Sequence, residues 1–209
     1  MTLPTLAPGS ADALLFDLGH VVLDIDFKRA IACWARHGGC EPADITARFA
    51  ADEALRQYES GKIDDTAYFE GLRRMLGVDI THEQLLEGWN AIFIGEIPGI
   101  APLLARAAKR LPLYALSNTN PPHIAHFSKL HADVLGHFRE MYLSSTIGLL
   151  KPDRAAYDHV VKAIGAPASR IVFFDDLADN VAGARAYGLS AVHVKSSEDV
   201  ANALAALGI

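Results

Sequence analysis

The sequence is poor in cysteine and has neither a long apolar run nor a cluster of basic residues. Its 209 residues include two cysteines, Cys33 and Cys40, which are too few for a disulfide framework and are not spaced like zinc ligands. We interpret both as reduced thiols. No apolar run approaches the roughly 18 residues that span a bilayer, and residues 1–13 (MTLPTLAPGSADA) lack the basic and apolar regions of a signal peptide. We therefore expect a cytoplasmic protein with no membrane partner.

The charge balance argues against a nucleic-acid partner. The chain has 19 Lys and Arg against 25 Asp and Glu, a formal net charge of −6 at pH 7, whereas nucleic-acid binders usually carry a basic patch or stripe. The remaining composition, 51% hydrophobic and 21% charged, is typical of a globular protein. The length suits one α/β core with a sizeable insertion, or two small domains.

Apolar periodicity divides the chain into two kinds of region. Residues 13–16 form a continuous apolar run, as in a strand buried on both faces. Residues 27–95 show helical patterns alone, which we interpret as four helices at about residues 27–37, 43–58, 65–75 and 82–93. Beyond them, helices alternate with apolar strands at residues 113–116, 141–143, 171–174 and 191–194.

Strands that alternate with helices favour right-handed βαβ units and a parallel sheet covered on both faces. The sequence therefore predicts an α/β fold: a doubly wound parallel sheet, with a Rossmann-like core formed by residues 1–26 and 96–209. Residues 27–95 are expected to form a four-helix cap, inserted after the first strand and placed over one edge of the sheet.

Polar residues follow three of the apolar strands at the point where each strand ends. Asp17 follows the first, Ser117 the second, and Asp175 and Asp176 another, while Lys151 lies in a loop before a helix. An ionised Asp is costly in a dry site unless it is paired or hydrogen-bonded. In open parallel sheets the carboxyl ends of the strands form the ligand-binding edge, so we expect these side chains to meet there.

These segments resemble the four motifs of the haloacid dehalogenase superfamily of aspartate-nucleophile hydrolases. Each motif alone is common, but their order at the strand ends is specific, and the resemblance covers the whole chain. The segments FDLGHVVLDID, LSNTN and FFDDLADN are most similar to those of bacterial phosphatases of the sugar-1-phosphate (α-D-glucose-1-phosphate) type. The matching motifs are Phe16-Asp17-Leu18-Gly19, Leu116-Ser117-Asn118-Thr119, Lys151-Pro152, and Phe173-Phe174-Asp175-Asp176 followed by Asn180.

The resemblance implies a Mg²⁺-dependent phosphatase that acts through an aspartyl-phosphate. Asp17 would attack phosphorus and so divide one displacement into two easier steps. Because carboxylate and phosphate repel each other, a cation must bridge them, and the hard oxygen ligands that Mg²⁺ prefers are available. The implied metal ligands are Asp17, the main-chain carbonyl of Gly19 and Asp176, with Asp175 and Asn180 orienting the ligands or waters.

The same resemblance assigns the phosphate contacts. The Ser117 hydroxyl and the main-chain N–H of Asn118 would hold phosphate oxygens, and Lys151 would neutralise both Asp17 and the transferring phosphoryl group. The expected partner is a small-molecule phosphate, with a sugar phosphate favoured, and the chain is compatible with a monomer or a homodimer.

Gly19 departs from the pattern of most phosphatases in the superfamily. They carry a second Asp at this position, two residues after the nucleophile, which protonates the leaving oxygen and then activates water. A substrate with a good leaving group, such as a sugar 1-phosphate, would reconcile Gly19 with activity. The imidazole of His20 has a suitable pKa of about 6.5, although we favour a loop histidine with a local hydrogen bond.

Several further residues have alternative interpretations. Tyr58 and Glu59 are the cap residues that we expect to reach the site, whereas Asp24 and Asp26 are either substrate contacts or caps and hinge residues of the insertion. Four histidines are interpreted as a helix and loop surface rather than a metal cluster: His123, His126, His131 and His137.

Other functions remain open from sequence alone. In a 2-haloacid dehalogenase, Asp17 would attack carbon and no metal would be needed. The paired Asp175 and Asp176 would then place unfavourable negative charge beside the nucleophile. A phosphomutase would need an acid/base group at Gly19 for both half-reactions. A non-catalytic phosphate-binding protein of the same fold is the alternative from another class.

Overall fold

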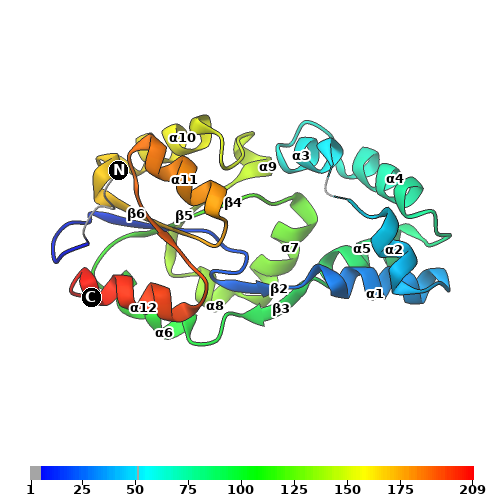
Figure 1. Ribbon diagram of the computed structural model, residues 1–209, viewed down its shortest axis with the longest axis horizontal. Coiled ribbons are helices and arrows are strands. Elements are labelled where there is room, and N and C mark those ends of the chain that lie inside the picture. The colour runs from blue at the N-terminus through cyan, green and yellow to red at the C-terminus, as the bar shows by residue number, and fades with distance from the viewer. Residues whose placement is uncertain (1–5, 51) are drawn as a thin grey trace.

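A five-stranded parallel sheet is the centre of the computed structural model, which describes residues 6–50 and 52–209 (Figure 1). The strand order is β5-β4-β1-β6-β7, and all four pairings are parallel. β1 therefore lies in the middle, between β4 and β6. The predicted doubly wound fold is confirmed. The strands are β1 (Ala13–Phe16), β4 (Leu113–Ser117), β5 (Phe138–Leu143), β6 (Ile171–Asp175) and β7 (Ser190–His193).

Helices cover both faces of the sheet because successive side chains of its strands point to opposite sides. Leu14 and Phe16 of β1 pack in the apolar core of one face, and Leu15 packs in that of the other. The first face is covered by α6 (Ile100–Ala108), α7 (Pro121–Leu130), α8 (Ala132–Leu135) and α12 (Ser197–Ala206), and the second by α10 (Arg154–Ile164) and α11 (Ala178–Tyr187). The short helices α9 (Ser144–Ile147) and η1 (Ala168–Arg170) lie in the connections.

A second group of helices has an apolar core of its own, beside the carboxyl ends of the strands (Figure 1). Large aromatic side chains dominate this core, among them Trp34, Tyr58, Phe69 and Trp89. We propose that residues 27–95 act as the cap predicted from the sequence. The helices are α1 (Phe27–Gly38), α2 (Pro42–Arg48), α3 (Glu53–Glu59), α4 (Asp65–Leu76) and α5 (His82–Asn90).

The prediction of one helix over residues 43–58 was wrong, so the described part of this region holds five helices rather than four. α2 ends where the backbone of Phe49 becomes extended, with ψ 122°. The Arg48 guanidinium donates to the Leu76 carbonyl (2.8 Å), and the Asp52 side chain accepts from Leu55 N and caps α3 (3.0 Å). A new N-cap and a long-range hydrogen bond thus end one helix and start another.

Two short strands, which the sequence pattern did not predict, connect the two groups of elements. β2 (Leu23–Ile25) and β3 (Phe93–Glu96) pair antiparallel and carry the chain out to the helices and back. Asp26 follows β2 and caps α1, since its carboxylate accepts from Lys28 N at 2.9 Å. Among the described helices, none is long and apolar enough to cross a membrane.

His123 is buried, which contradicts the surface position predicted for it. Its ring stacks on Trp89 of α5, with ring centroids 4.9 Å apart and planes 13° apart. Its Nδ1 lies 3.1 Å from the Asn120 amide nitrogen, so Nε2 carries the proton and donates to the Trp89 carbonyl at 2.9 Å. Burial lowers the pKa of His123 to about 4. A neutral imidazole on α7 therefore joins the sheet core to α5.

The buried His123 makes stability depend on pH. Its pKa is about 4 in the fold against 6.5 for the free side chain, so between these values the unfolded chain binds more protons and acidification favours unfolding. Relative to His123→Phe, wild type should lose about 2 kcal/mol of unfolding free energy between pH 7 and pH 5. Urea denaturation at both pH values measures this, with His137→Phe as the control. A wild-type advantage that does not change with pH would contradict the assignment.

Two glycines test the packing of the cap. A Cβ added at Gly88 would lie 2.1 Å from Nε1 of the buried Trp34, whereas one at Gly71 would meet nothing within 4 Å. We expect Gly88→Ala to lower the free energy of unfolding by about 1–3 kcal/mol through overpacking. Gly71→Ala should raise it by about 0.5–1 kcal/mol through helix propensity. Urea denaturation distinguishes them, and equal effects would refute the close approach of α1 to α5.

Candidate active site

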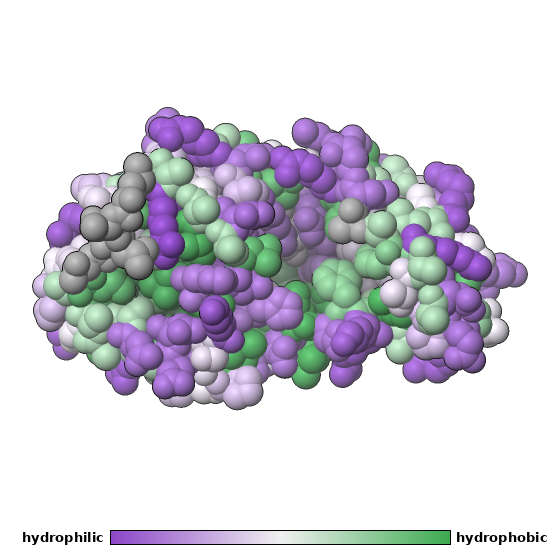
Figure 2. Space-filling model, viewed as in Figure 1, coloured by the Kyte–Doolittle hydropathy of each residue, from purple (hydrophilic) through white to green (hydrophobic). Residues whose placement is uncertain are grey.

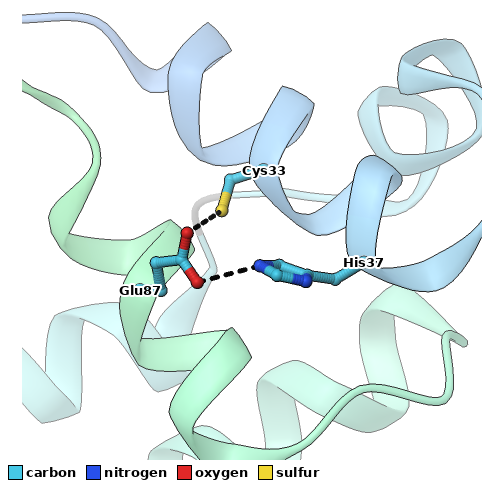
Figure 3. A group of neighbouring side chains, drawn as sticks. All are labelled: Cys33, His37 and Glu87. Carbon is cyan, nitrogen blue, oxygen red and sulfur yellow. Dashed lines mark hydrogen bonds and ion pairs between the residues drawn. The ribbon is translucent and has the colours of Figure 1, made fainter.

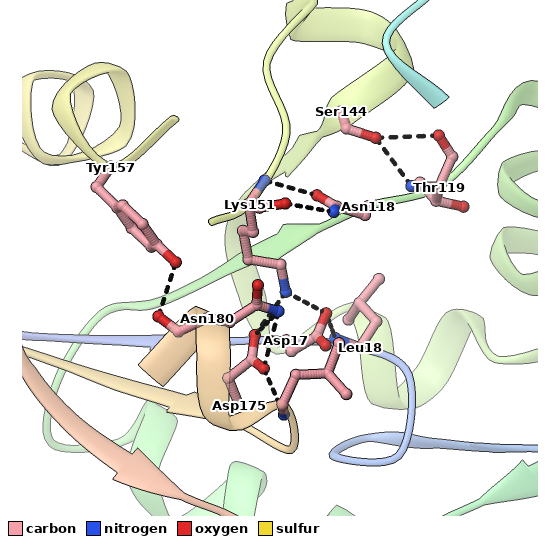
Figure 4. Close-up of polar contacts among 10 residues, drawn as sticks. Asp17, Leu18, Asn118, Thr119, Ser144, Lys151, Tyr157, Asp175 and Asn180 are labelled. Atoms are coloured by element: carbon pink, nitrogen blue, oxygen red, sulfur yellow. Dashed lines mark hydrogen bonds and ion pairs between the residues drawn. The ribbon is translucent and has the colours of Figure 1, made fainter. Parts of the chain in front are cut away.

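Lys151 joins the ends of two neighbouring strands. Its Nζ lies 2.8 Å from Asp17 Oδ1 and 2.7 Å from Asp175 Oδ2 (Figure 4). Asp17 directly follows β1, and Asp175 is the last residue of β6, which pairs with β1. The side chains of Lys151 and Asp175 are fully buried, and 11% of the Asp17 side chain is exposed. The structure thus brings together three residues from distant parts of the sequence.

Asn118 holds the backbone of Lys151 in place. Its Oδ1 accepts from Lys151 N and its Nδ2 donates to the Lys151 carbonyl, both at 2.9 Å (Figure 4). Sequence reasoning assigned a role only to the main chain of Asn118. The side-chain role was missed because its partner lies 33 residues farther along the chain.

Asp175 is saturated with hydrogen bonds. Asn180 Nδ2 donates to both carboxylate oxygens, at 3.0 and 3.1 Å, and Leu177 N donates to Oδ1 at 2.8 Å. The Tyr157 hydroxyl in turn donates to the Asn180 carbonyl at 2.8 Å. These contacts hold Asp175 in place beside Lys151. The role predicted for Asp175 and Asn180, to orient metal ligands or waters, stays a prediction.

Negative charge exceeds positive charge at this edge of the sheet. Burial raises the pKa of Asp17, the Lys151 ammonium opposes the rise, and Asp175 adds to it. Burial also raises the pKa of Asp176, and Asp175 adds to that shift. For Lys151, burial lowers the pKa, but Asp17 and Asp175 outweigh it and the net shift is upward. One buried ammonium thus faces three carboxyl groups.

The excess carboxylates suit a divalent cation. Oxygens of Asp17, Asp175 and Asp176 lie within 4.8 Å of one another. The Asp175 carboxylate is already bound by Lys151 and Asn180, which leaves Asp17 and Asp176 as the available carboxyl ligands. Hard oxygen donors on a rigid edge are what Mg²⁺ requires. The donor set therefore fits the ion, and the predicted ligands Asp17, Gly19 and Asp176 all line one hollow.

A second group of metal-ligating side chains has a different explanation. Cys33, His37 and Glu87 meet between α1 and α5, where His37 Nε2 lies 2.9 Å from Glu87 Oε2 and Cys33 Sγ lies 3.6 Å from Oε1 (Figure 3). The Arg36 guanidinium forms an ion pair with the Glu87 carboxylate at 3.1 Å and lies 3.4 Å from Cys33 Sγ. A cation is already present, so we interpret this group as an ion pair that links two cap helices.

Two adjoining hollows lie between the sheet edge and the cap, and Figure 2 shows that this face of the molecule is indented between the two groups of elements. We call the first, of about 570 Å³, the polar hollow, because its lining includes the charged residues Asp17, Lys151 and Asp176. The second, of about 480 Å³, is mostly apolar. Gly19, Ile25, Phe27, Ser117 and Asn118 line both, so the two hollows form one continuous site.

The residues around Gly19 take distinct places. A Cβ at Gly19 would lie 3.1 Å from Cδ1 of Ile25, so a side chain at position 19 requires Ile25 to move. His20 has a positive φ of 55° and lines the polar hollow. Of the two cap residues expected at the site, Glu59 lines the apolar hollow, whereas Tyr58 is buried in the cap and donates to Asp65 Oδ1 at 2.8 Å.

Comparison with known proteins agrees with this geometry. A family model described as haloacid dehalogenase-like hydrolase matches residues 11–188, most of the chain. The chain belongs to the haloacid dehalogenase-like hydrolase family. The resemblance noted from the four motifs is confirmed, and so is the prediction of a hydrolase.

Three curated proteins similar to this chain are named as phosphatases. D-ribitol-5-phosphate phosphatase of Bacteroides thetaiotaomicron is 24% identical over 80% of this chain and 84% of its own length. A phosphatase of Mycobacterium tuberculosis is 28% identical over 90% of this chain and 89% of its own. A sesquiterpene phosphatase of Aspergillus oryzae is 31% identical over 69% and 74%.

Solved structures of the family share the fold. A HAD family enzyme from Bacteroides thetaiotaomicron, in complex with magnesium and inorganic phosphate, matches with a TM-score of 0.79 at 25% identity, over 89% of this chain and 95% of that one. L-2-haloacid dehalogenase from Xanthobacter autotrophicus matches with a TM-score of 0.64 at 19% identity, over 92% and 81%. The dehalogenase likeness shows the fold alone.

Mg²⁺ should stabilise the protein, because a cation between Asp17 and Asp176 relieves the excess negative charge. At 100 times its dissociation constant a ligand of the folded state adds about 2.7 kcal/mol. We expect a rise in melting temperature with Mg²⁺ in wild type and its loss in Asp176→Asn. Asp179→Asn, an exposed change on α11, should keep the rise. A full Mg²⁺ effect in Asp176→Asn would contradict the assigned ligand.

Proposed function

We propose that this protein is a Mg²⁺-dependent phosphomonoester hydrolase that acts through an aspartyl-phosphate on Asp17. The observation that carries the proposal is the pairing of Asp17 with Lys151 at the carboxyl edge of the sheet, beside the carboxyl group of Asp176. Two carboxyl groups and one buried ammonium are arranged to receive a dianionic phosphate together with a divalent cation. The name of the relative in complex with magnesium and inorganic phosphate supports this proposal.

The attacking atom can be assigned to one oxygen. Asp17 Oδ1 accepts from Leu18 N at 2.7 Å and from Lys151 Nζ at 2.8 Å, and Oδ2 has no hydrogen-bond partner among the described residues. Oδ1 is thus held in place, and Oδ2 is the oxygen free to attack phosphorus. Mg²⁺ bound at Asp17 and Asp176 would supply positive charge between the carboxylate and the phosphate.

The remaining residues bind and neutralise the phosphoryl group. Lys151 remains charged in the buried site and faces the transferring oxygens. The Ser117 hydroxyl and the Asn118 N–H lie at the end of β4 and line both hollows, where they are placed to donate to phosphate oxygens. Because Asn118 also holds the Lys151 backbone, one residue couples phosphate binding to the position of the ammonium.

Two substrate classes follow from the site and the relatives. A small sugar or polyol phosphate is our first proposal, supported by the name of the D-ribitol-5-phosphate phosphatase. The apolar lining of the second hollow, by residues such as Leu18, Ile92 and Phe127, favours a second class, phosphate esters of less polar alcohols. A dehalogenase is disfavoured because Asp176 adds negative charge beside the nucleophile.

A substrate screen tests the proposed function. We expect Mg²⁺-dependent release of phosphate from at least one member of a panel of sugar 1-phosphates, sugar 6-phosphates, polyol phosphates and prenyl phosphates. EDTA should abolish it, and Asp17→Asn should reduce kcat at least about a thousandfold, because the covalent route is lost. Asp179→Asn, an exposed change on α11, is the matched control.

Two results would contradict the proposal. Chloride release from 2-haloacids that persists in EDTA would assign the protein to the dehalogenases. Binding of phosphate without turnover of any ester would support a non-catalytic member of the fold.

A further inference from the structure

The proposed reaction needs a proton donor that position 19 does not provide. When the bond between phosphorus and the leaving oxygen breaks, an alkoxide must be protonated, and water must later lose a proton as it attacks the aspartyl-phosphate. Gly19 has no side chain, and the Ile25 side chain lies where one would extend. The donor must therefore come from elsewhere in the site.

The in-line geometry of phosphoryl transfer determines on which side of the phosphorus the proton donor must lie. The leaving oxygen departs on the side of phosphorus opposite to the attacking group, hence away from Asp17. Asp17 directly follows β1 and lines the polar hollow, and the cap helices lie beyond the carboxyl ends of the strands (Figure 1). The donor should consequently line the apolar hollow, which is shared between sheet edge and cap.

Most titratable groups near this hollow are already engaged. Both ring nitrogens of His123 have partners, Asn120 and the Trp89 carbonyl. The Lys151 ammonium is paired with two carboxylates. His20 lines the polar hollow together with Asp176 and does not line the apolar one.

Glu59 remains. It ends α3 and lines the apolar hollow together with Gly19, Ser117 and Asn118. Its carboxyl group has no hydrogen-bond or ion-pair partner among residues 6–50 and 52–209. The charged and titratable groups that face it are Asp17, Lys151 and Tyr68. Burial raises the pKa of Glu59 to about 7, with Lys151 opposing and Asp17 adding to the shift, so both protonation states are populated near neutral pH.

Contacts on both sides of Glu59 hold it against the sheet core. On one side, Arg56 Nη2 lies 2.6 Å from Asp153 Oδ2, just before α10. On the other, Gly61 has φ +68°, and a Cβ there would lie 2.6 Å from the Ser145 carbonyl oxygen in α9. The segment that carries Glu59 thus lies in close contact with the core, which places the end of α3 beside the site.

We propose that Glu59 is the acid and base of the reaction, in the role that Gly19 cannot fill; this rests on the proposed function. In the first step, Asp17 Oδ2 forms a bond to phosphorus, the bond to the leaving oxygen breaks, and the Glu59 carboxyl gives its proton to that oxygen. In the second, the Glu59 carboxylate takes a proton from water as the water oxygen bonds to phosphorus and the bond to Asp17 breaks. Inorganic phosphate leaves, and both carboxyl groups return to their starting states.

Leaving-group dependence tests this role. Benzyl phosphate and 4-nitrophenyl phosphate are similar in size, but the first releases a basic alkoxide that needs a proton, whereas the second releases a stable anion. Since kcat/KM covers the steps up to departure of the leaving group, Glu59→Gln should lower it about 10²–10⁴-fold for benzyl phosphate. For 4-nitrophenyl phosphate the loss should be less than about tenfold. Glu59→Asp should restore part of the benzyl phosphate activity.

Glu53→Gln is the matched control, because Glu53 is an exposed glutamate on the same helix; it should change neither ester, and melting temperatures verify that each variant folds. Equal losses on both esters would mean that Glu59 positions the cap or substrate and would overturn the proton-transfer role. No loss on either would remove Glu59 from the reaction. A wild-type protein that releases phosphate neither from these two esters nor from any member of the substrate panel, even with Mg²⁺, overturns the proposed function and this role with it.

Discussion

The buried ammonium of Lys151, between Asp17 and Asp175, is the contact on which the rest of the site depends. Removing one partner of a buried ion pair typically costs about 3–5 kcal/mol, because the other charge is left uncompensated. Asn118 holds the Lys151 backbone, Asn180 holds Asp175, and Tyr157 holds Asn180. This network fixes the ammonium. Among the described residues, no other residue forms a hydrogen bond to Asp17 Oδ2 or to the Asp176 carboxyl group, so both are available to the substrate and the cation.

The site combines a polar half built by the sheet with a mostly apolar half completed by the cap. Every phosphate ester presents the same dianion to the polar half, so discrimination among substrates must come from the second half. The contacts of Arg56 with Asp153, and of Gly61 with Ser145, bring α3 onto the core beside this half. Under the proposed function, the strand ends carry out phosphoryl transfer, and the inserted helices select the alcohol that leaves.

The parallel sheet could be predicted because strands that alternate with helices form right-handed βαβ units. The meeting of Asp17, Ser117, Lys151 and Asp175 could be predicted because the carboxyl ends of such strands lie at one edge of the sheet. The sequence did not predict what depends on distant partners. The break between α2 and α3 comes from the Asp52 cap and from Arg48 reaching Leu76. β2 and β3 are too short for an alternating pattern to appear. The burial of His123 depends on Trp89, and the side-chain role of Asn118 on Lys151.

Rapid acid quenching during turnover, followed by mass spectrometry of the peptide that contains Asp17, tests the central claim of the account most directly. We predict one added phosphoryl group on Asp17 in wild type, formed only with substrate and Mg²⁺, and its absence from Asp17→Asn. Phosphate release without any phosphorylated peptide, or with the phosphoryl group on a different residue, would contradict the assignment of Asp17 as the nucleophile.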